Sequence, residues 1–198
     1  MLINYLGHAY FYLQGNDYSI ALDPFGKIGL PEKPVKADYV FCSHNHYDHN
    51  NVILTPNAKL ITENSGVFEI IPTYHDEVKG AKRGLNNVLK FTLDGKVCVF
   101  MGDIGVIDTN VINATKGCDF LFIPVGGVYT INYKEAKHYV DEIKPKTVIP
   151  MHYKLNGSTV DVDDVMKFLN EFSSVETVNS PYNDAENIKN VLFLKAEL

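Results

Sequence analysis

One short segment carries the residue types best suited to chemistry. Three of the seven histidines fall within six residues, in the run His44-Asn45-His46-Tyr47-Asp48-His49. Alternate residues of an extended chain point to the same side, so His44 and His46 can share one metal ion. Asp48 and His49 follow where the chain must turn, and they can reach a second ion. Imidazole and carboxylate groups are usual ligands of zinc and similar ions, so the pattern predicts a metal site rather than a polar loop that is histidine-rich by chance.

The histidine segment must be positioned by a strand, because the apolar run 37–43 ends directly before it. Short sequences rich in Gly, Asn and Asp predict tight hairpins at 14–17 and at Asp94-Gly95. Further apolar runs predict strands at 10–13, 18–22, 59–62, 88–93, 96–101, 120–125, 147–150 and 191–194.

Helices are expected mainly in the second half of the chain. Asn132 and Glu135 form a capping-box pattern that begins a helix over 133–143. Asp161 can cap a second helix that continues to Phe172, and 107–115 is a weaker candidate. Strands come first and βα units follow, and the apolar strands need cover on both faces. A layered α/β sandwich that forms a single domain over residues 1–198 is the predicted architecture.

Composition and charge narrow the class of protein. The chain has 198 residues and 22.2 kDa, with 18 Lys+Arg against 24 Asp+Glu, so its net charge is 18 − 24 = −6. This balance argues against nucleic-acid partners and against a grip on anionic lipid, which both need a basic face. No run approaches the roughly 18 apolar residues of a membrane helix, so no membrane insertion is expected. The first residues lack a basic stretch, and the three cysteines form no CxxC pair; both observations favour a cytoplasmic location without disulfides.

His-x-His-x-Asp-His after a strand resembles the signature of the metallo-β-lactamase fold superfamily. The resemblance implies a four-layer αββα sandwich and a binuclear metal site. It adds His75, in the run 72–76, as a third histidine for the first ion, and His152, in 149–153, as a histidine for the second ion. Asp103, in 101–105, would bridge both ions. The implied ligand sets are therefore His44, His46 and His75 for one ion and Asp48, His49 and His152 for the other.

The resemblance extends to one branch of that superfamily. The runs 6–9 and 21–24, Arg83-Gly84 and 124–130 resemble small Zn-dependent hydrolases similar to ascorbate-6-phosphate lactonase. This implies a hydrolase that uses a metal-bridging hydroxide on a small ester, lactone or phosphoester. The same type of core occurs in phospholipase-D-like phosphodiesterases, which are one alternative; a non-catalytic metal-binding module is another. Phe100-Met101 stands where relatives often carry a histidine, but no implied ligand is lost.

The implied roles complete a candidate active site. Asp48 would orient the hydroxide and, with Asp103, form the catalytic pair. Asp23 and His8 would hydrogen-bond to the metal ligands and orient them; the alternatives are an ordinary turn aspartate and a buried structural histidine. Tyr129 and Thr130 follow a strand, where sites collect in α/β folds, and could line a substrate pocket. Arg83 and Asn87 could meet an anionic substrate group or simply be solvated.

The expected cofactor is a pair of divalent ions, with zinc favoured by the histidine-rich ligand set and manganese or iron as alternatives. The expected partner is a small-molecule substrate. The 12 Tyr and 11 Phe leave material for a homo-oligomer interface.

Overall fold

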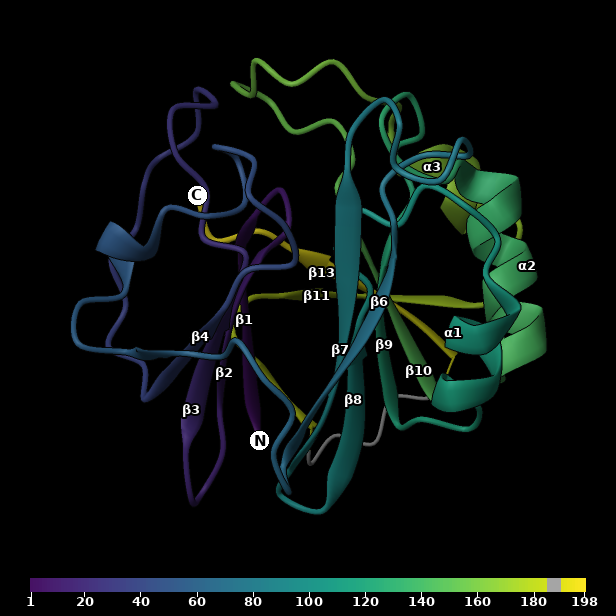
Figure 1. The fold of residues 1–198 in the computed structure, drawn as a ribbon. Helices are drawn as coiled ribbons and strands as arrows, with labels where there is room; N and C mark the ends of the chain where they lie inside the picture. Colours follow the sequence, from purple (N-terminus) through teal and green to yellow (C-terminus); the bar gives the residue numbers. More distant parts are fainter. Residues whose placement is uncertain (185–189) are drawn as a thin grey trace.

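Two β-sheets pack face to face, and helices lie on the outer side of one of them (Figure 1). The computed structural model describes residues 1–184 and 190–198. In the described part, the first sheet has the strand order β12-β1-β2-β3-β4-β5. Its strands are β1 (Leu2–Gly7), β2 (Tyr10–Gln14), β3 (Ser19–Leu22), β4 (Tyr39–Phe41), β5 (Lys59–Leu60) and β12 (Tyr182–Asn183).

The second sheet has the order β11-β13-β10-β9-β8-β7-β6. Its strands are β6 (Phe68–Tyr74), β7 (Leu85–Leu93), β8 (Lys96–Phe100), β9 (Phe120–Pro124), β10 (Thr147–Met151), β11 (Val175–Asn179) and β13 (Asn190–Lys195). Aromatic side chains join the two sheets: the rings of Phe11 and Phe122 lie 4.9 Å apart between centroids, in an edge-to-face arrangement. β9 is buried along its whole length, as expected for an apolar strand covered on both faces.

Within the described residues of the second half of the chain, three α-helices form: α1 (Thr109–Thr115), α2 (Tyr133–Ile143) and α3 (Met166–Leu169). The predicted bounds of α2 and its capping box between Asn132 and Glu135 are confirmed. The helix expected from Asp161 to Phe172 begins later than predicted: residues 161–164 are not helical, and α3 with its flanking turns covers only 165–171. Residues 160–162 alternate buried, exposed and buried, which is the pattern of an extended chain, because Val160 and Val162 pack against the first sheet.

The outer face of the first sheet is covered by irregular chain rather than by an α-helix. Phe25, Ile28 and Leu30, which follow β3, bury their side chains there. Leu54 of a short 3-10 helix, η1 (Val52–Leu54), joins the same cluster. The outer layer on this side of the sandwich is therefore thin, and the loops in it can reach the edge where β3 and β4 end.

Within each sheet, the strands that directly precede the candidate metal ligands all run in the same direction. β1 and β3 are both antiparallel to β2, and β4 is parallel to β3. In the other sheet β6 and β8 are both antiparallel to β7, and β9 and β10 continue parallel to β8. The carboxyl ends within each sheet therefore meet at one edge, which is where side chains can converge.

The three cysteines are all free, as expected. Among the described residues, no helix is both long and apolar enough to cross a membrane.

Candidate metal centre

The carboxyl ends of six strands place the candidate ligands close together. His8 follows β1, Asp23 follows β3, and the histidine segment 44–49 follows β4. In the second sheet His75 follows β6, Asp103 comes shortly after β8, and His152 follows β10. Side chains 144 positions apart in the sequence, such as those of His8 and His152, thus lie with ring centroids 4.2 Å apart.

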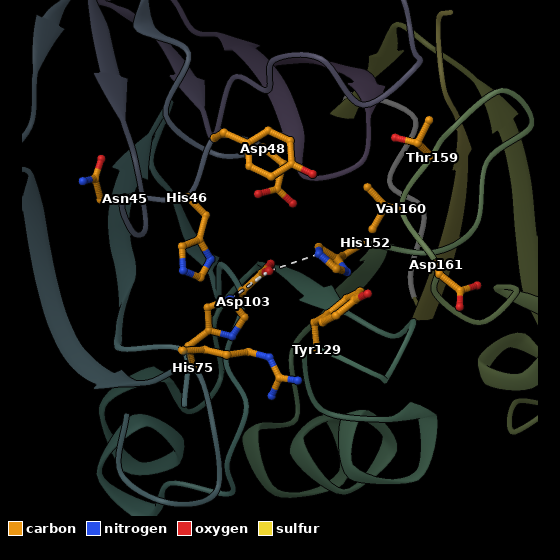
Figure 2. Close-up of a pocket in the computed structure, with 12 residues that line it drawn as sticks. Asn45, His46, Asp48, His75, Asp103, Tyr129, His152, Thr159, Val160 and Asp161 are labelled. Carbon is orange, nitrogen blue, oxygen red and sulfur yellow. Dashed lines mark ion pairs between the residues drawn. The ribbon is translucent and has the colours of Figure 1, made fainter. Parts of the chain in front are cut away.

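The carboxylate of Asp103 lies at the centre of the cluster. Its Oδ2 is 3.2 Å from Nε2 of His49, 3.3 Å from Nε2 of His75 and 3.0 Å from Nε2 of His152. Figure 2 shows His46, Asp48, His75 and His152 arranged around this carboxylate. One side chain therefore contacts histidines assigned by the sequence to both ions.

The other donor atoms form two groups that match the expected ligand sets, and a third group of Asp23, His44 and His49 overlaps them. Each group offers ligand atoms within 4.8 Å of one another. The first contains His44, His46 and His75, the set expected for one ion; the second contains Asp48, His49 and His152, the set expected for the other, together with His8.

Unpaired polar atoms show that the cluster suits a cation. Nε2 of His44 and Oδ1 of Asp103 are buried without any hydrogen-bond partner. Leaving such atoms unpaired inside a protein costs free energy, and they are rare for that reason. A divalent ion accepts lone pairs from both groups, so these orphaned atoms fit metal ligands.

The pKa shifts point the same way except at His49, where Asp103 and Asp23 outweigh burial and raise the pKa well above its usual value. Burial and the neighbouring His49 together lower the pKa of His44 to about 2. Burial also lowers the pKa of His46. Burial would raise the pKa of Asp103, but His152 and His49 outweigh it and hold that pKa well below its usual range. Neutral imidazoles and an ionised carboxylate are the forms that bind a divalent ion.

Asp23 orients two of the imidazoles from behind. Its Oδ2 accepts the Nδ1 hydrogen of His49 at 2.8 Å and the hydroxyl hydrogen of Ser43 at 2.6 Å. The Ser43 oxygen in turn lies 2.9 Å from Nδ1 of His44. When Nδ1 is used in this way, the Nε2 lone pair of each ring faces the cluster. Asp23 thus takes the supporting place expected for it, and Ser43 is a partner that the sequence did not reveal.

His8 touches the second group directly. Its Nε2 lies 3.2 Å from Oδ2 of Asp48 and 3.2 Å from Nε2 of His49. Burial and the neighbouring His152 together lower the pKa of His8 to about 3. The His8 side chain is therefore a neutral neighbour of two candidate metal ligands. A histidine with a purely structural role would not need to contact them.

The backbone is strained where it presents these side chains. His8, Asp23 and His152 have φ angles of 56°, 45° and 53°. Residues other than glycine seldom adopt this left-handed conformation, and such strain concentrates at functional sites.

Asn86 supports Asp103 in a way that the sequence did not signal. Its amide oxygen accepts the backbone N–H of Asp103 at 2.9 Å, and its nitrogen donates to the Met101 carbonyl at 2.8 Å. Gly102 has φ 53°, and a Cβ there would collide with Ser43 and with the Asn86 oxygen. The tight approach of these backbones therefore requires glycine directly before Asp103.

A cavity of about 600 Å³ opens over the cluster. Arg83 and Tyr129 line it, as expected for substrate residues, and Thr130 lines a smaller adjoining cavity. Asn87 lines neither, because its amide donates to the Ser43 carbonyl at 3.0 Å and joins the two sheets there. Five further lining residues were not predicted as such from the sequence: Tyr47 and, labelled in Figure 2, Asn45, Thr159, Val160 and Asp161.

His138 lies apart from the centre. It is exposed on α2, as the sequence predicts, and lines neither cavity. The variant His138→Ala is expected to keep the metal content and the turnover of the parent protein within about twofold, because surface changes of this kind cost little. Elemental analysis and kcat/KM check this; a large loss of either quantity would place the functional centre elsewhere.

Comparison with known proteins agrees with this geometry. A family model described as a beta-lactamase superfamily domain matches residues 2–152. A UPF0173 metal-dependent hydrolase of Pyrococcus abyssi is 30% identical, over 76% of this chain and 84% of the relative. Another, from Staphylothermus marinus, is 31% identical over 77% and 83%.

A solved structure is similar over the whole chain. It is a crystal structure from Thermotoga maritima, whose name places it among Zn-dependent hydrolases of the metallo-beta-lactamase superfamily. It has a TM-score of 0.81 and 31% identity, and the match covers 99% of each chain. This likeness confirms the expected αββα class of fold, in which irregular chain and η1 form the thin outer layer on the first sheet.

Proposed function

Because the chain belongs to the metallo-β-lactamase superfamily and is a metal-dependent hydrolase, we propose that its cluster of histidines and aspartates holds two divalent ions. His44, His46 and His75 bind one ion; Asp48, His49 and His152 bind the other; Asp103 contacts both. The observation that carries this proposal is the position of Asp103, whose Oδ2 lies within 3.3 Å of histidines from both groups.

Bound ions of this kind lower the pKa of a water molecule and polarise the oxygen of a substrate. The protein's own residues prepare the site for that chemistry. Asp23 fixes the ring orientation of His49 directly and that of His44 through Ser43. Asp48 is held by His8, whose Nε2 lies 3.2 Å from its Oδ2, and this contact fixes the carboxylate beside the proposed second ion. No serine or cysteine nucleophile is needed.

The substrate is proposed to be a small ester, lactone or phosphoester. A cavity of about 600 Å³ holds a small molecule, and the cluster forms part of its wall. Zinc is the proposed metal because imidazole-rich sites suit it, and manganese or iron are the alternatives that metal analysis separates. The cytoplasmic location, the single domain and any self-association stay predictions.

Replacing His152 tests the two-ion centre. The parent protein is expected to hold about two ions per chain after zinc or manganese is supplied, and His152→Ala about one, because one of three ligands of the second group is lost. Elemental analysis gives the count, and an esterase, lactonase and phosphodiesterase panel gives the reaction. Fewer than one ion in the parent, with none regained from added zinc or manganese, would instead favour a non-catalytic module.

The same panel separates the hydrolytic alternatives. Turnover of phosphodiesters without turnover of carboxylic esters or lactones would favour the phospholipase-D-like reaction. Turnover of esters or lactones alone supports the lactonase-like reaction.

A further inference from the structure

One arginine stands at the boundary between two cavities. Arg83 is the only arginine in a chain that has 17 lysines. It lines the main cavity together with His75 and Asp103, and it also lines the adjoining cavity of about 320 Å³. A permanently charged side chain therefore lies beside the candidate metal centre, at the one position where the sequence uses arginine instead of lysine.

The guanidinium of Arg83 is held in place by a neighbouring loop. Its central carbon lies 5.4 Å from the centroid of the Tyr129 ring. Its Nη2 donates to the carbonyl of Val128 at 3.4 Å. A planar guanidinium stacks on an aromatic face and still presents a fork of N–H donors, which a lysine ammonium does not do.

The loop that supplies these contacts is itself strained. Val128 has φ 61°, which is a rare conformation for a β-branched residue, and its side chain is exposed. Strain of this kind persists where the surrounding structure requires one backbone path. Here that path directs the Val128 carbonyl and the Tyr129 ring toward the arginine.

Asp76 fixes the other side of the arrangement. Its buried carboxylate accepts four backbone N–H groups, from Val78, Gly80, Lys82 and Arg83, at 2.7–3.0 Å. Asp76 directly follows His75, so the loop 76–84 is closed beside a candidate metal ligand. Asp76 is thus a positioning residue, because it holds the backbone of Arg83 beside the cavity.

The guanidinium has no anionic partner within residues 1–184 and 190–198. Two nearby carboxylates are already used: Glu77 pairs with Lys82 at 3.1 Å, and Glu135 accepts the backbone N–H of Asn132 at 2.8 Å. Among the described residues, the guanidinium of Arg83 has a hydrogen bond only to Val128 and a ring contact only with Tyr129. Most of its donors therefore face the cavities without an acceptor from the protein.

We propose that Arg83, which lies over the Tyr129 ring, binds a carboxylate or phosphate group of the substrate. This anionic group is distinct from the bond to be cleaved, which lies beside Asp103 in the candidate metal centre. An arginine fork matches the planar carboxylate and the phosphate oxygens, and such charge-assisted hydrogen bonds are strong. The substrate class is then an ester or lactone that carries a second, anionic group. This proposal rests on the hydrolase function proposed above.

Three activated esters with the same 4-nitrophenol leaving group test the proposal. Their acyl chains have equal length and end in a methyl, a carboxylate or a phosphate group. The wild-type holoenzyme is expected to show kcat/KM about ten- to hundredfold higher for at least one anionic ester than for the neutral one. The carboxylate and phosphate arms identify which anion the site takes.

Variants then assign the preference to the arginine. In Arg83→Gln the ratio of anionic to neutral kcat/KM is expected to fall to about one, and Arg83→Lys should recover only part of it. Lys134→Gln is the matched control, because Lys134 also lies over a tyrosine ring, at 5.8 Å, but lines neither cavity. A ratio near one in the wild type, or a ratio kept in Arg83→Gln, would overturn the proposal.

A binding measurement separates this proposal from the proposed function. Calorimetric titration of the holoenzyme with inorganic phosphate and with succinate requires no turnover. At least tenfold weaker binding of one anion by Arg83→Gln than by the wild type supports the subsite even if none of the esters reacts. Equal binding by both proteins rejects the subsite, whereas absence of turnover with intact anion binding counts only against the hydrolase assignment.

Discussion

Asp103→Ala is expected to lower kcat/KM by at least about a thousandfold on whichever ester or phosphoester the wild type hydrolyses. The reason is that this carboxylate lies within 3.3 Å of Nε2 atoms from His49, His75 and His152. Under the proposed two-ion centre, removing it would take a shared ligand from both ions. Metal-ion catalysis contributes several kcal/mol, and about 4 kcal/mol corresponds to a thousandfold change in rate. Steady-state kinetics measure the loss, and elemental analysis of the same sample measures the ions retained.

Asp103→Asn is the matched variant, because the amide keeps the volume of the side chain and removes its charge. It should also lose activity, with the far-UV circular dichroism of a folded protein in both variants. Full activity in Asp103→Ala, with two ions bound, would show that the bridging role is assigned to the wrong residue.

Asp23→Ala is expected to lower the free energy of unfolding by about 3–5 kcal/mol. Asp23 is fully buried and accepts hydrogen bonds from the backbone and hydroxyl of Ser43 and from Nδ1 of His49. Without the carboxylate these buried donors have no acceptor, which is more costly than never having buried them. Alanine at φ 45° adds strain of about 1–2 kcal/mol. Urea denaturation of the metal-free protein measures the change.

Controls distinguish this network from a general effect of removing an acid. Glu176→Ala, on exposed strand β11, should change stability by no more than about 0.5 kcal/mol. Asp23→Asn keeps a residue that tolerates a left-handed backbone, so it should lose less stability than the alanine variant while weakening metal binding about 10- to 100-fold. A wild-type urea midpoint in Asp23→Ala would mean that the network does not stabilise the fold.

Some features follow from local sequence and agree with the structure. The capping box at Asn132 defines where α2 begins, because its partners lie three residues apart and need nothing from the rest of the chain. The Asp94-Gly95 turn does the same for the hairpin of β7 and β8. The spacing of the histidine segment 44–49 is equally local, and it indicated metal chemistry before any contact was known.

Other features depended on contacts that local sequence does not contain. The segment after Asp161 has a helical pattern of apolar residues, yet its first residues, up to 164, are not helical. Val160 and Val162 instead pack against the outer face of the first sheet, and helical turns begin only at Val165. Asn87 was predicted to be available to a substrate, but its side-chain amide donates a hydrogen bond to the carbonyl of Ser43, just after β4. Such competition between partners is decided only when distant strands meet.

The sequence by itself thus determined the chemistry available to this protein: which side chains could bind a cation, and which strands would carry them. The tertiary structure decided how they work together. Common strand direction in each sheet brings His8, Asp103 and His152 to one edge. Packing around them supplies Asp23, Ser43 and Asn86 as supports and turns Arg83 toward the cavity. The physical reason is that ligand identity is a property of single residues, whereas orientation and burial arise from contacts between segments far apart in the chain.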